Sequence, residues 1–340
     1  MASKNSERMC YDFLYDYLED CYERLKRYCH ANNLEDRNGD GGRRKLRLNP
    51  ETADLLSRVN FRGGELPDYS DPHVQELYCI RYMYAYAYEY RKMYSRLLKE
   101  LKTPLMNILS VGCGNGIDLW AAWEAQWRLK QKSGRGKQIK YTGLDLVDWN
   151  HKWGEGDFRL QCTADYQTGD PSGDAVQYLE EHPVLEQNIF MFPKSISEFT
   201  NTDFGRISRA FAKAKFQYEQ DGCMKDRKKV YFLVSFRYNG MGSLEKLEDK
   251  KRSDRLVKAM ERNRFSLDDE NEAQVFVGSP DKTIAECDRN LEYVNTYFYE
   301  RYDVKNFLEE LKRKDNGIFA PMQATKYSCY RIMTFVREKA

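Results

Sequence analysis

The sequence predicts an α/β fold in which helices cover both faces of a mostly parallel β-sheet. From residue 105 onward, short apolar runs alternate with helical stretches, a pattern typical of a doubly wound sheet. A short apolar strand, three closely spaced glycines and a helical run follow one another at residues 108–130. The chain before residue 71 has helical periodicity without this alternation, so we expect a helical N-terminal extension.

Helical signals precede the predicted sheet. Apolar residues recur at intervals of three and four over residues 9–30, which predicts an amphipathic helix. A polar, glycine-rich break follows, and a short helix is expected at 50–59. The pair Asp71-Pro72 supplies an N-cap and a first-turn proline for a long helix that ends at about residue 101.

These signals divide the chain into the helical extension, residues 1–70, and an α/β domain, residues 71–340. A charged stretch, Leu244–Arg264, predicts a surface helix within a charged helical insertion at about 240–285. The predicted strands are 108–111, 139–144, 158–162, 188–192, 230–236, 291–299 and 327–336. The predicted helices between them are 117–130, 173–181, 202–216 and 304–311.

The composition disfavours several classes of protein. Nine Cys are scattered without a Cys-x-x-Cys pair and only four His are present, so we expect neither disulfides nor a bound metal. The N-terminus has no apolar stretch and no run of 18 apolar residues occurs, so we expect no secretion signal, no membrane partner and a cytoplasmic location. A formal net charge of +2 argues against polyanion binding by the whole surface, but not against a local basic groove.

Three glycines, Gly112, Gly114 and Gly116, lie between a predicted strand and a predicted helix. Glycine has no Cβ, so a ligand can approach the backbone of such a turn closely. A dinucleotide-binding turn has the spacing Gly-x-Gly-x-x-Gly, which would place a glycine where this chain has Ile117. S-adenosylmethionine carries no phosphate and requires only close approach of the backbone. The turn therefore favours this methyl donor over a dinucleotide.

Residues 108–116 read Ile-Leu-Ser-Val-Gly-Cys-Gly-Asn-Gly and resemble the first motif of the class I S-adenosylmethionine-dependent methyltransferases. The resemblance implies a doubly wound, seven-stranded Rossmann-like sheet, S-adenosylmethionine as cofactor and methyl transfer as the activity. Ser110 departs from the motif, because the family often has an acidic residue there, near the amino end of the cofactor. The resemblance also implies that the cofactor is bound by Gly112, Cys113, Gly114, Asn115 and Gly116.

Two further segments resemble later strands of the same family. Tyr141–Asp145 resembles the second strand, whose terminal carboxylate accepts hydrogen bonds from the ribose hydroxyls. Phe158–Asp165 resembles the third strand, whose trailing Asp meets the adenine amino group. We therefore expect cofactor contacts at Asp145, at the adjacent Leu146 and at Asp165.

A tyrosine-rich helix, residues 78–90, offers one more candidate. Its tyrosines are expected to pack the helix on the sheet. The alternative is that Arg81 or a tyrosine reaches the carboxylate of the cofactor and covers the pocket, which would also supply a contact that Ser110 lacks.

The segment after the predicted fourth strand holds the candidates for chemistry, because residues there face the methyl group in the resembled family. Lys194 would become a base if it were desolvated, and Ser195 and Glu198 are further polar candidates. Ser195 and Glu198 also match the Ser-x-x-Glu pattern of a capping box, so a structural role competes with a catalytic one. No Cys follows Pro193, which disfavours the covalent cytosine route, and the segment lacks an Asn/Asp-Pro-Pro-aromatic pattern. The acceptor stays open: an O-, N- or S-nucleophile on RNA, a protein or a small molecule.

Two other classes of function compete with methyl transfer. A catalytically silent cofactor-binding or interaction protein could have the same fold, because fold and function separate easily. A nicotinamide-dependent oxidoreductase is disfavoured by Ile117. Basic residues cluster at 43–47, 225–229 and 246–264, but the last group is interleaved with acidic residues and predicts a solvated helix. Binding to nucleic acid is therefore possible, but the sequence pattern does not indicate it.

Overall fold

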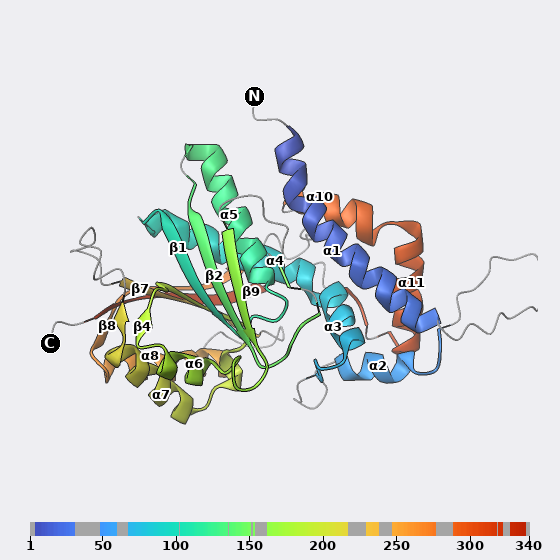
Figure 1. Ribbon diagram of the computed structural model, residues 1–340. Helices are drawn as coiled ribbons and strands as arrows, with labels where there is room; N and C mark the ends of the chain where they lie inside the picture. Colours follow the sequence, from blue (N-terminus) through green and yellow to red (C-terminus); the bar gives the residue numbers. More distant parts are fainter. Residues whose placement is uncertain are drawn as a thin grey trace, which may run out of the picture. The chain divides into compact units, whose positions relative to one another are not determined.

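A seven-stranded β-sheet has the strand order β3-β2-β1-β5-β7-β9-β8 in the computed structural model (Figure 1). Strands β3, β2, β1, β5 and β7 are parallel, and β9 runs antiparallel to β7 and β8. This arrangement confirms the predicted doubly wound, mostly parallel sheet. The strands are β1 Leu105–Val111, β2 Gln138–Asp145, β3 Cys162–Thr168, β5 Ile189–Pro193, β7 Lys229–Ser235, β8 Phe265–Phe276 and β9 Tyr327–Arg337. A separate two-stranded sheet joins β4 Val184–Leu185 and β6 Lys215–Phe216.

The structure describes residues 4–30, 48–59, 67–101, 103–134, 136–150, 152–153, 162–216, 229–237, 247–276, 288–317, 319–321 and 327–337.

Helices pack on both faces of the sheet (Figure 1). On one face, α6, α7 and α8 enclose an apolar core with side chains of β1, β5 and β7. On the other face, α5 is buried from Ile117 to Trp127, and the Arg91 guanidinium of α4 pairs with Glu124 of α5. The helices are α4 Tyr84–Glu100, α5 Ile117–Ser133, α6 Ala175–Glu181, α7 Asn201–Lys213 and α8 Glu248–Glu261.

The central strands are apolar because helices cover both of their faces. β5 reads Ile-Phe-Met-Phe-Pro, and only Pro193 at its end is not buried. The rings of Phe190 and Phe232, on neighbouring strands, stack with centroids 5.2 Å apart. Near-continuous apolar runs of this kind are typical of parallel strands. They give the carboxyl ends of β1, β5 and β7 a rigid support.

The strand order reverses between β1 and β5. From β1 the chain continues to β2 on one side, whereas β5 pairs with the other side of β1. In open α/β sheets, ligands bind outside the carboxyl ends of the strands at such a switch point. The topology therefore indicates that a ligand would bind at the loops after Val111 and Pro193.

Two expectations for the second half of the chain are wrong. Leu291–Tyr299, predicted as a strand, is helical: α10 Arg289–Val294 continues into a π-helical turn, Asn295–Tyr299. The strand that pairs with the outer side of β9 is β8, which lies inside the predicted charged helical insertion. β8 is an edge strand whose acidic residues form ion pairs with cations on β7 and β9. Charges are common on edge strands, so its composition resembles that of a surface helix. The helical part of the insertion is α8.

A second compact unit consists of Met1–Tyr86 together with Asp281–Thr325. The sheet belongs to the unit formed by Ala87–Pro280 and Lys326–Ala340. This division differs from the predicted boundary at residue 70, because the segment that contains α10 and α11 groups with the N-terminal helices. The helices that belong wholly to the second unit are α1 Lys4–His30, α2 Thr52–Val59, α3 Pro72–Tyr78, α10 Arg289–Val294 and α11 Tyr302–Lys314.

The predicted helix after Asp71 is present. The Asp71 side chain accepts a hydrogen bond from the backbone N–H of His73, as expected of an N-cap before Pro72. The helical run from Pro72 to Glu100 is interrupted by a π-helical turn, Cys79–Met83.

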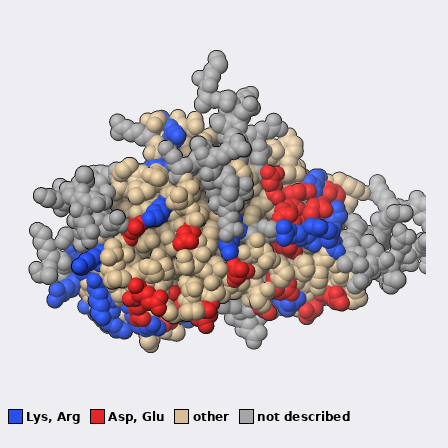
Figure 2. Space-filling view, in the orientation of Figure 1, with Lys and Arg blue, Asp and Glu red and all other residues tan. Residues whose placement is uncertain are grey.

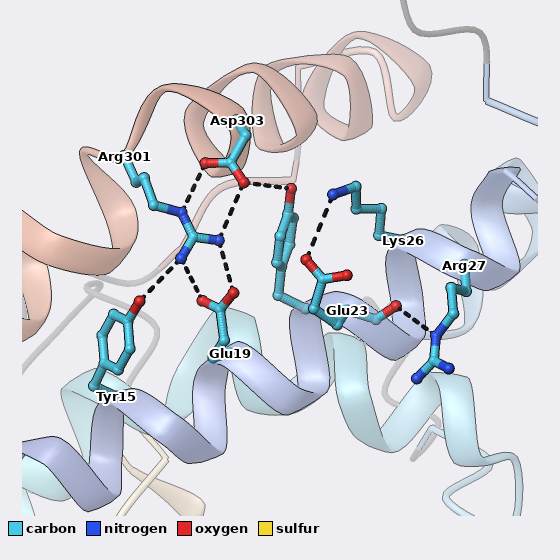
Figure 3. A network of polar contacts seen from close by, with 8 residues as sticks. Tyr15, Glu19, Glu23, Lys26, Arg27, Arg301 and Asp303 are labelled. Atoms are coloured by element: carbon cyan, nitrogen blue, oxygen red, sulfur yellow. Dashed lines mark hydrogen bonds and ion pairs between the residues drawn. The ribbon is translucent and has the colours of Figure 1, made fainter.

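One arginine joins the first and last helices of this second unit (Figure 3). Arg301, at the N-cap of α11, donates to both carboxylate oxygens of Glu19 on α1, at 2.6 and 2.9 Å, and to the Tyr15 hydroxyl at 3.0 Å. Its Nε also donates to Asp303 at 2.7 Å, and Asp303 accepts a further hydrogen bond from Tyr22. Bidentate guanidinium–carboxylate pairs fix geometry as well as charge. Arg301 therefore positions the chain after residue 288 against the N-terminal helix.

Candidate functional site

The glycine turn leads from β1 into α5 at the switch point. Gly112, Gly114 and Gly116 have φ of 68°, 57° and 77°, a region that residues with a Cβ rarely adopt. A Cβ on Gly112 would lie 2.6 Å from the Cβ of Ser195, and a Cβ on Gly116 would overlap the Tyr166 hydroxyl. Both the backbone conformation and the crowding therefore require glycine. Gly112 and Gly114 stay partly exposed, so their backbone is open to a ligand.

The N-terminus of α5 is already satisfied by the chain itself. The backbone N–H of Ile117 donates to the Asn115 side chain at 3.2 Å, and the buried Asp118 carboxylate accepts from the Tyr141 hydroxyl at 2.9 Å. Burial raises the pKa of Asp118 to about 6, against the hydrogen bond from Tyr141, which lowers it. A helix N-terminus that holds its own carboxylate does not attract a pyrophosphate. The turn thus fits a ligand without phosphate.

Asp118 was not among the predicted site residues. Its sequence signal is an acidic residue in the first turn of the helix that follows the glycines, a common feature of helix N-termini. Its burial under Ser110 and Tyr141 depends on the packing of β1 and β2 against α5, which no local pattern reveals.

Asp145 ends β2 and braces the glycine turn. Its carboxylate accepts hydrogen bonds from the backbone N–H of Gly114 at 2.7 Å and of Val147 at 2.9 Å. Burial raises the pKa of Asp145, while these two bonds lower it. Because a carboxylate has about four acceptor positions, capacity remains for a ligand hydroxyl. The adjacent Leu146 is 59% exposed, so these two predicted contacts lie side by side at the carboxyl edge.

Three aromatic residues that the sequence did not identify as site residues, Trp149, Trp153 and Tyr166, lie beside the glycine turn. The Trp149 ring would lie 3.5 Å from a Cβ on Gly114. The backbone N–H of Trp153 donates to the carbonyl of Asn115 at 3.0 Å, and the Tyr166 hydroxyl donates to the carbonyl of Trp153 at 2.6 Å. Their only sequence signal is the presence of two Trp in an otherwise polar loop after Asp145. They form a wall beside the predicted cofactor residues Cys113 and Asn115, which are buried.

The expectation that Asp165 trails the third strand is wrong. β3 runs from Cys162 to Thr168, and Asp165 lies within it, opposite Thr142 of β2. Its exposed side chain accepts a hydrogen bond from Gln167 at 2.9 Å. The residue that lies opposite Asp145 at the carboxyl end is Thr168. The apolar run that suggested a strand at 158–162 lies, apart from its last residue, outside the described residues.

Arg81 belongs to the unit of the N-terminal helices, whereas the glycine turn belongs to the sheet unit. Its guanidinium lies over the rings of Tyr82 and Phe319, 5.1 and 5.5 Å from their centroids. Within its own unit, the structure thus shows a cation–π role for Arg81.

Lys194 and Ser195 tie the ends of the central strands together. Lys194, at a positive φ of 66°, donates from Nζ to Glu89 at 2.6 Å and to the carbonyl of Phe236 at 2.7 Å. Ser195 Oγ donates to the carbonyl of Val111, at the end of β1. The predicted capping box of Ser195 and Glu198 is therefore wrong, because the serine side chain turns toward β1. A capping box forms instead five residues later, between Thr200 and Asp203.

Glu89 on α4 is a site residue that sequence reasoning missed. It is 1% exposed and accepts hydrogen bonds from Lys194 of the loop after β5 and from Ser235 at the end of β7. A glutamate among alternating Tyr and Ala in a helix is the only sequence signal. Buried carboxylates need such partners. Glu89 thus holds the carboxyl ends of two strands in register.

Glu198 ends a short 3₁₀ turn, Ile196–Glu198, beside this edge. Surrounding protein raises the pKa of its carboxyl to about 7; the carboxylates of Asp145 and Asp249 add to this rise, and Arg237 opposes it. The side chain is nevertheless exposed to water. Among the described residues, no Lys or Arg lies within ion-pair distance of Glu198 or Asp145. The edge therefore carries a proton acceptor near neutral pH and an excess of negative charge.

Comparisons with known proteins find similarity in structure but not in sequence. No protein-family model and no curated protein matches the chain. A loganic acid methyltransferase with SAH is 11% identical, with 76% of this chain and 94% of that chain covered and a TM-score of 0.36. A SAM-dependent methyltransferase from Archaeoglobus fulgidus is 15% identical, with 72% and 94% covered and a TM-score of 0.33. One from Geobacter sulfurreducens in complex with S-adenosyl-L-homocysteine is 12% identical, with 74% and 91% covered and a TM-score of 0.32.

None of the helices in the described part of the chain combines the length and the apolar character needed to cross a bilayer. No group of three or more His, Cys, Asp or Glu among the described residues is arranged to hold a metal ion.

Proposed function

We propose that the protein transfers a methyl group from S-adenosylmethionine to an acceptor nucleophile at the carboxyl edge of β1, β2 and β5. The observation that carries this proposal is the glycine turn with three positive φ angles, braced by the carboxylate of Asp145 at the switch point of the sheet. The resemblance of residues 108–116 to the first motif of class I methyltransferases supports the same ligand.

The charge of the edge also suits this donor. S-adenosylmethionine carries a positive sulfonium and no phosphate. Asp145 and Glu198 supply negative charge without a paired cation among the described residues, and Asp118 already occupies the N-terminus of α5. A nicotinamide dinucleotide would bring a pyrophosphate toward these carboxylates. The arrangement therefore favours the sulfonium nucleoside over the dinucleotide.

When bound, S-adenosylmethionine supplies an electrophilic methyl group on its sulfur. Asp145 and Leu146 bind the nucleoside, and the backbone of Gly112, Cys113, Gly114, Asn115 and Gly116 lines the turn. Glu198 takes up the proton that the acceptor releases, because its pKa of about 7 matches this task at neutral pH. Lys194 donates to Glu89 and to a backbone carbonyl, so it positions the loop and Ser195 beside it. The acceptor is an O-, N- or S-nucleophile on RNA, protein or a small molecule.

Incubation with radiolabelled S-adenosylmethionine and separate RNA, protein and metabolite fractions tests this function. We expect label in one fraction with the wild type, and a loss of roughly 10²–10⁴-fold with Glu198→Gln, as expected for removal of a general base. The matched control is Glu261→Gln, an exposed glutamate at the end of α8, which should transfer label normally. Absence of label from every fraction with the wild type would count against the enzyme and leave the silent cofactor-binding protein as the better account.

A further inference from the structure

A cavity of about 360 Å³ opens between α7 and α8, and the glycine turn does not line it. Its walls come from the first turns of α7 and the second half of α8. Gly205, in the middle of α7, lies in this wall. A glycine inside a helix costs about 0.5–1 kcal/mol relative to alanine. Here the missing side chain leaves room next to Arg209, whose Nη1 would lie 3.5 Å from a Cβ.

Four cationic side chains line this groove: Arg209 from α7, and Arg255, Lys258 and Arg262 from α8. Positions 255, 258 and 262 share one face of the helix, because residues three and four apart are neighbours. Among the described residues, no carboxylate lies within ion-pair distance of Arg209, Lys258 or Arg262. Arg255 has only Glu248, at 3.7 Å, which a second arginine also contacts. The groove is therefore left with unneutralised positive charge.

Two acidic residues of α8, Asp249 and Asp254, do not neutralise the groove, although they belong to the same charged stretch of sequence. Asp249 accepts from the backbone of Arg237, and Asp254 pairs with Arg331 of β9 at 2.7 Å. Both carboxylates are thus engaged on the side of the helix that faces the sheet. The predicted surface helix is present as α8, and its exposed Arg255 and Lys258 line the groove.

The space-filling view supports a local concentration of charge. Figure 2 shows Lys and Arg side chains gathered along the edge where Figure 1 places α7 and α8, with acidic side chains beside them. Neutral polar residues complete the lining: Asn201 is exposed, and the Asn263 side chain donates to Ser208 Oγ and to the carbonyl of Ala259, both at 2.9 Å. The buried ring of Phe204 closes the inner wall.

We propose that this groove binds phosphate groups of an anionic ligand, as a site separate from the proposed cofactor site. Guanidinium groups match phosphate oxygens in bidentate geometry, and lysine adds a point charge. Four cations around one cavity of this size suit more than one phosphate better than a single carboxylate. The phosphates could belong to a free polyphosphate or to the backbone of a nucleic acid, which present the same chemistry.

The test uses two probes on the full chain: inorganic tripolyphosphate by calorimetry, and a short, labelled single-stranded RNA by fluorescence anisotropy. The variant Lys258→Gln/Arg262→Gln removes two groove cations from the end of α8. The matched control, Lys130→Gln/Lys132→Gln, removes the same charge from the last turn of α5. We expect the groove variant to lose at least about tenfold in affinity for the probe that binds, a loss of about 1.4 kcal/mol, and the control to lose less than about twofold.

The two probes separate the sources of phosphate. Tripolyphosphate binding that the groove variant loses indicates a free phosphorylated ligand. RNA binding alone, with a slope of log affinity against log salt concentration that is shallower by about 1.4 in the variant because two phosphate contacts are lost, indicates a nucleic-acid backbone. The proposal is overturned if neither probe binds at physiological salt, or if the control loses as much affinity as the groove variant. If the double variant does not fold, Arg209→Gln on α7 replaces it as the groove variant. S-adenosylmethionine affinity, measured on the same samples, reports on the cofactor site separately.

Discussion

At the residue scale, Asp145 connects the observed structure of the glycine turn with the proposed ligand contact. It accepts a hydrogen bond from the N–H of Gly114, and we propose that its remaining acceptor positions bind a ligand hydroxyl. The turn and the predicted ribose contact are therefore coupled through one side chain.

We expect Asp145→Ala to weaken S-adenosylmethionine binding by one to two orders of magnitude, because hydrogen bonds to a charged group contribute about 1.5–3 kcal/mol. Calorimetry measures this directly. Asp165→Ala is the matched control, since Asp165 lies exposed within β3 and away from the strand's end. Equal losses of S-adenosylmethionine affinity in the two variants would show that the Asp145 carboxylate does not bind the ligand.

We expect ligand binding at the proposed site to depend on pH through Glu198. Its carboxyl is largely neutral below its pKa of about 7 and negative above it. The negative form attracts a sulfonium but not the neutral sulfur of S-adenosylhomocysteine. We expect the ratio of affinities for the two nucleosides to rise about three- to tenfold in favour of S-adenosylmethionine between pH 6 and 8, as for a charge interaction of about 1 kcal/mol.

Glu198→Gln should remove this contribution to the rise. The amino groups of the two nucleosides titrate identically in both proteins, so the difference between the wild-type and variant ratios isolates Glu198. A wild-type ratio that is flat over the same range would place Glu198 too far from the sulfur to act on it.

At the element scale, the glycine turn needs glycine for two reasons: its backbone has positive φ angles, and neighbouring side chains leave no room for a Cβ. We expect Gly116→Ala to destabilise the protein by at least about 2 kcal/mol more than Gly134→Ala, measured by chemical denaturation. Both glycines have a positive φ, which costs a residue with a Cβ about 1–2 kcal/mol. Only Gly116 faces Tyr166; nothing lies within 4 Å of a Cβ on Gly134.

A second substitution tests why Gly116→Ala should lose more stability than Gly134→Ala. Tyr166→Phe removes the hydroxyl that a Cβ on Gly116 would overlap, so the double variant should recover part of the stability. Similar stabilities of Gly116→Ala and Gly134→Ala would show that crowding against Tyr166 is not a factor.

Several elements could be predicted because their signals are local. The strand before Gly112, the helix after Gly116 and the cap at Asp71 each follow from residues within one or two turns. β8 could not be predicted, since its acidic residues are explained only by cations on β7 and β9 that pair with them in the folded sheet.

The same limit applies to the site. Gly112 and Asp145 are recognisable from their order along the chain. Glu89 and Asp118 are not, because their roles come from contacts with residues far away in the sequence: Glu89 with Lys194, Asp118 with Tyr141. The Ser195 and Glu198 pattern was misleading because its serine bonds to a neighbouring strand.

At the scale of the whole molecule, stability should depend on pH through Asp118. Its pKa of about 6 in the folded protein lies above the value near 3.8 of an exposed aspartate. Protonation therefore favours the folded state, and this contribution, fully present below about pH 4, is lost as pH rises through 6. Relative to Asp118→Asn, the wild type should lose roughly 2–3 kcal/mol of unfolding free energy between pH 4 and 7.

The comparison with Asp118→Asn isolates this group, because every other titrating side chain is common to both proteins. Denaturant titrations at several pH values supply the measurement. Parallel stability curves for the two proteins would show that the carboxyl of Asp118 titrates normally in the folded state.

The identity of the nucleoside bound at the glycine turn tests the central claim most directly. Calorimetric titration of the full chain with S-adenosylmethionine, S-adenosylhomocysteine and NAD should give saturable heat with the first two and none with NAD. Asp145→Ala should lose most of that heat. Saturable binding of NAD, with no heat from either sulfur nucleoside, would contradict the account.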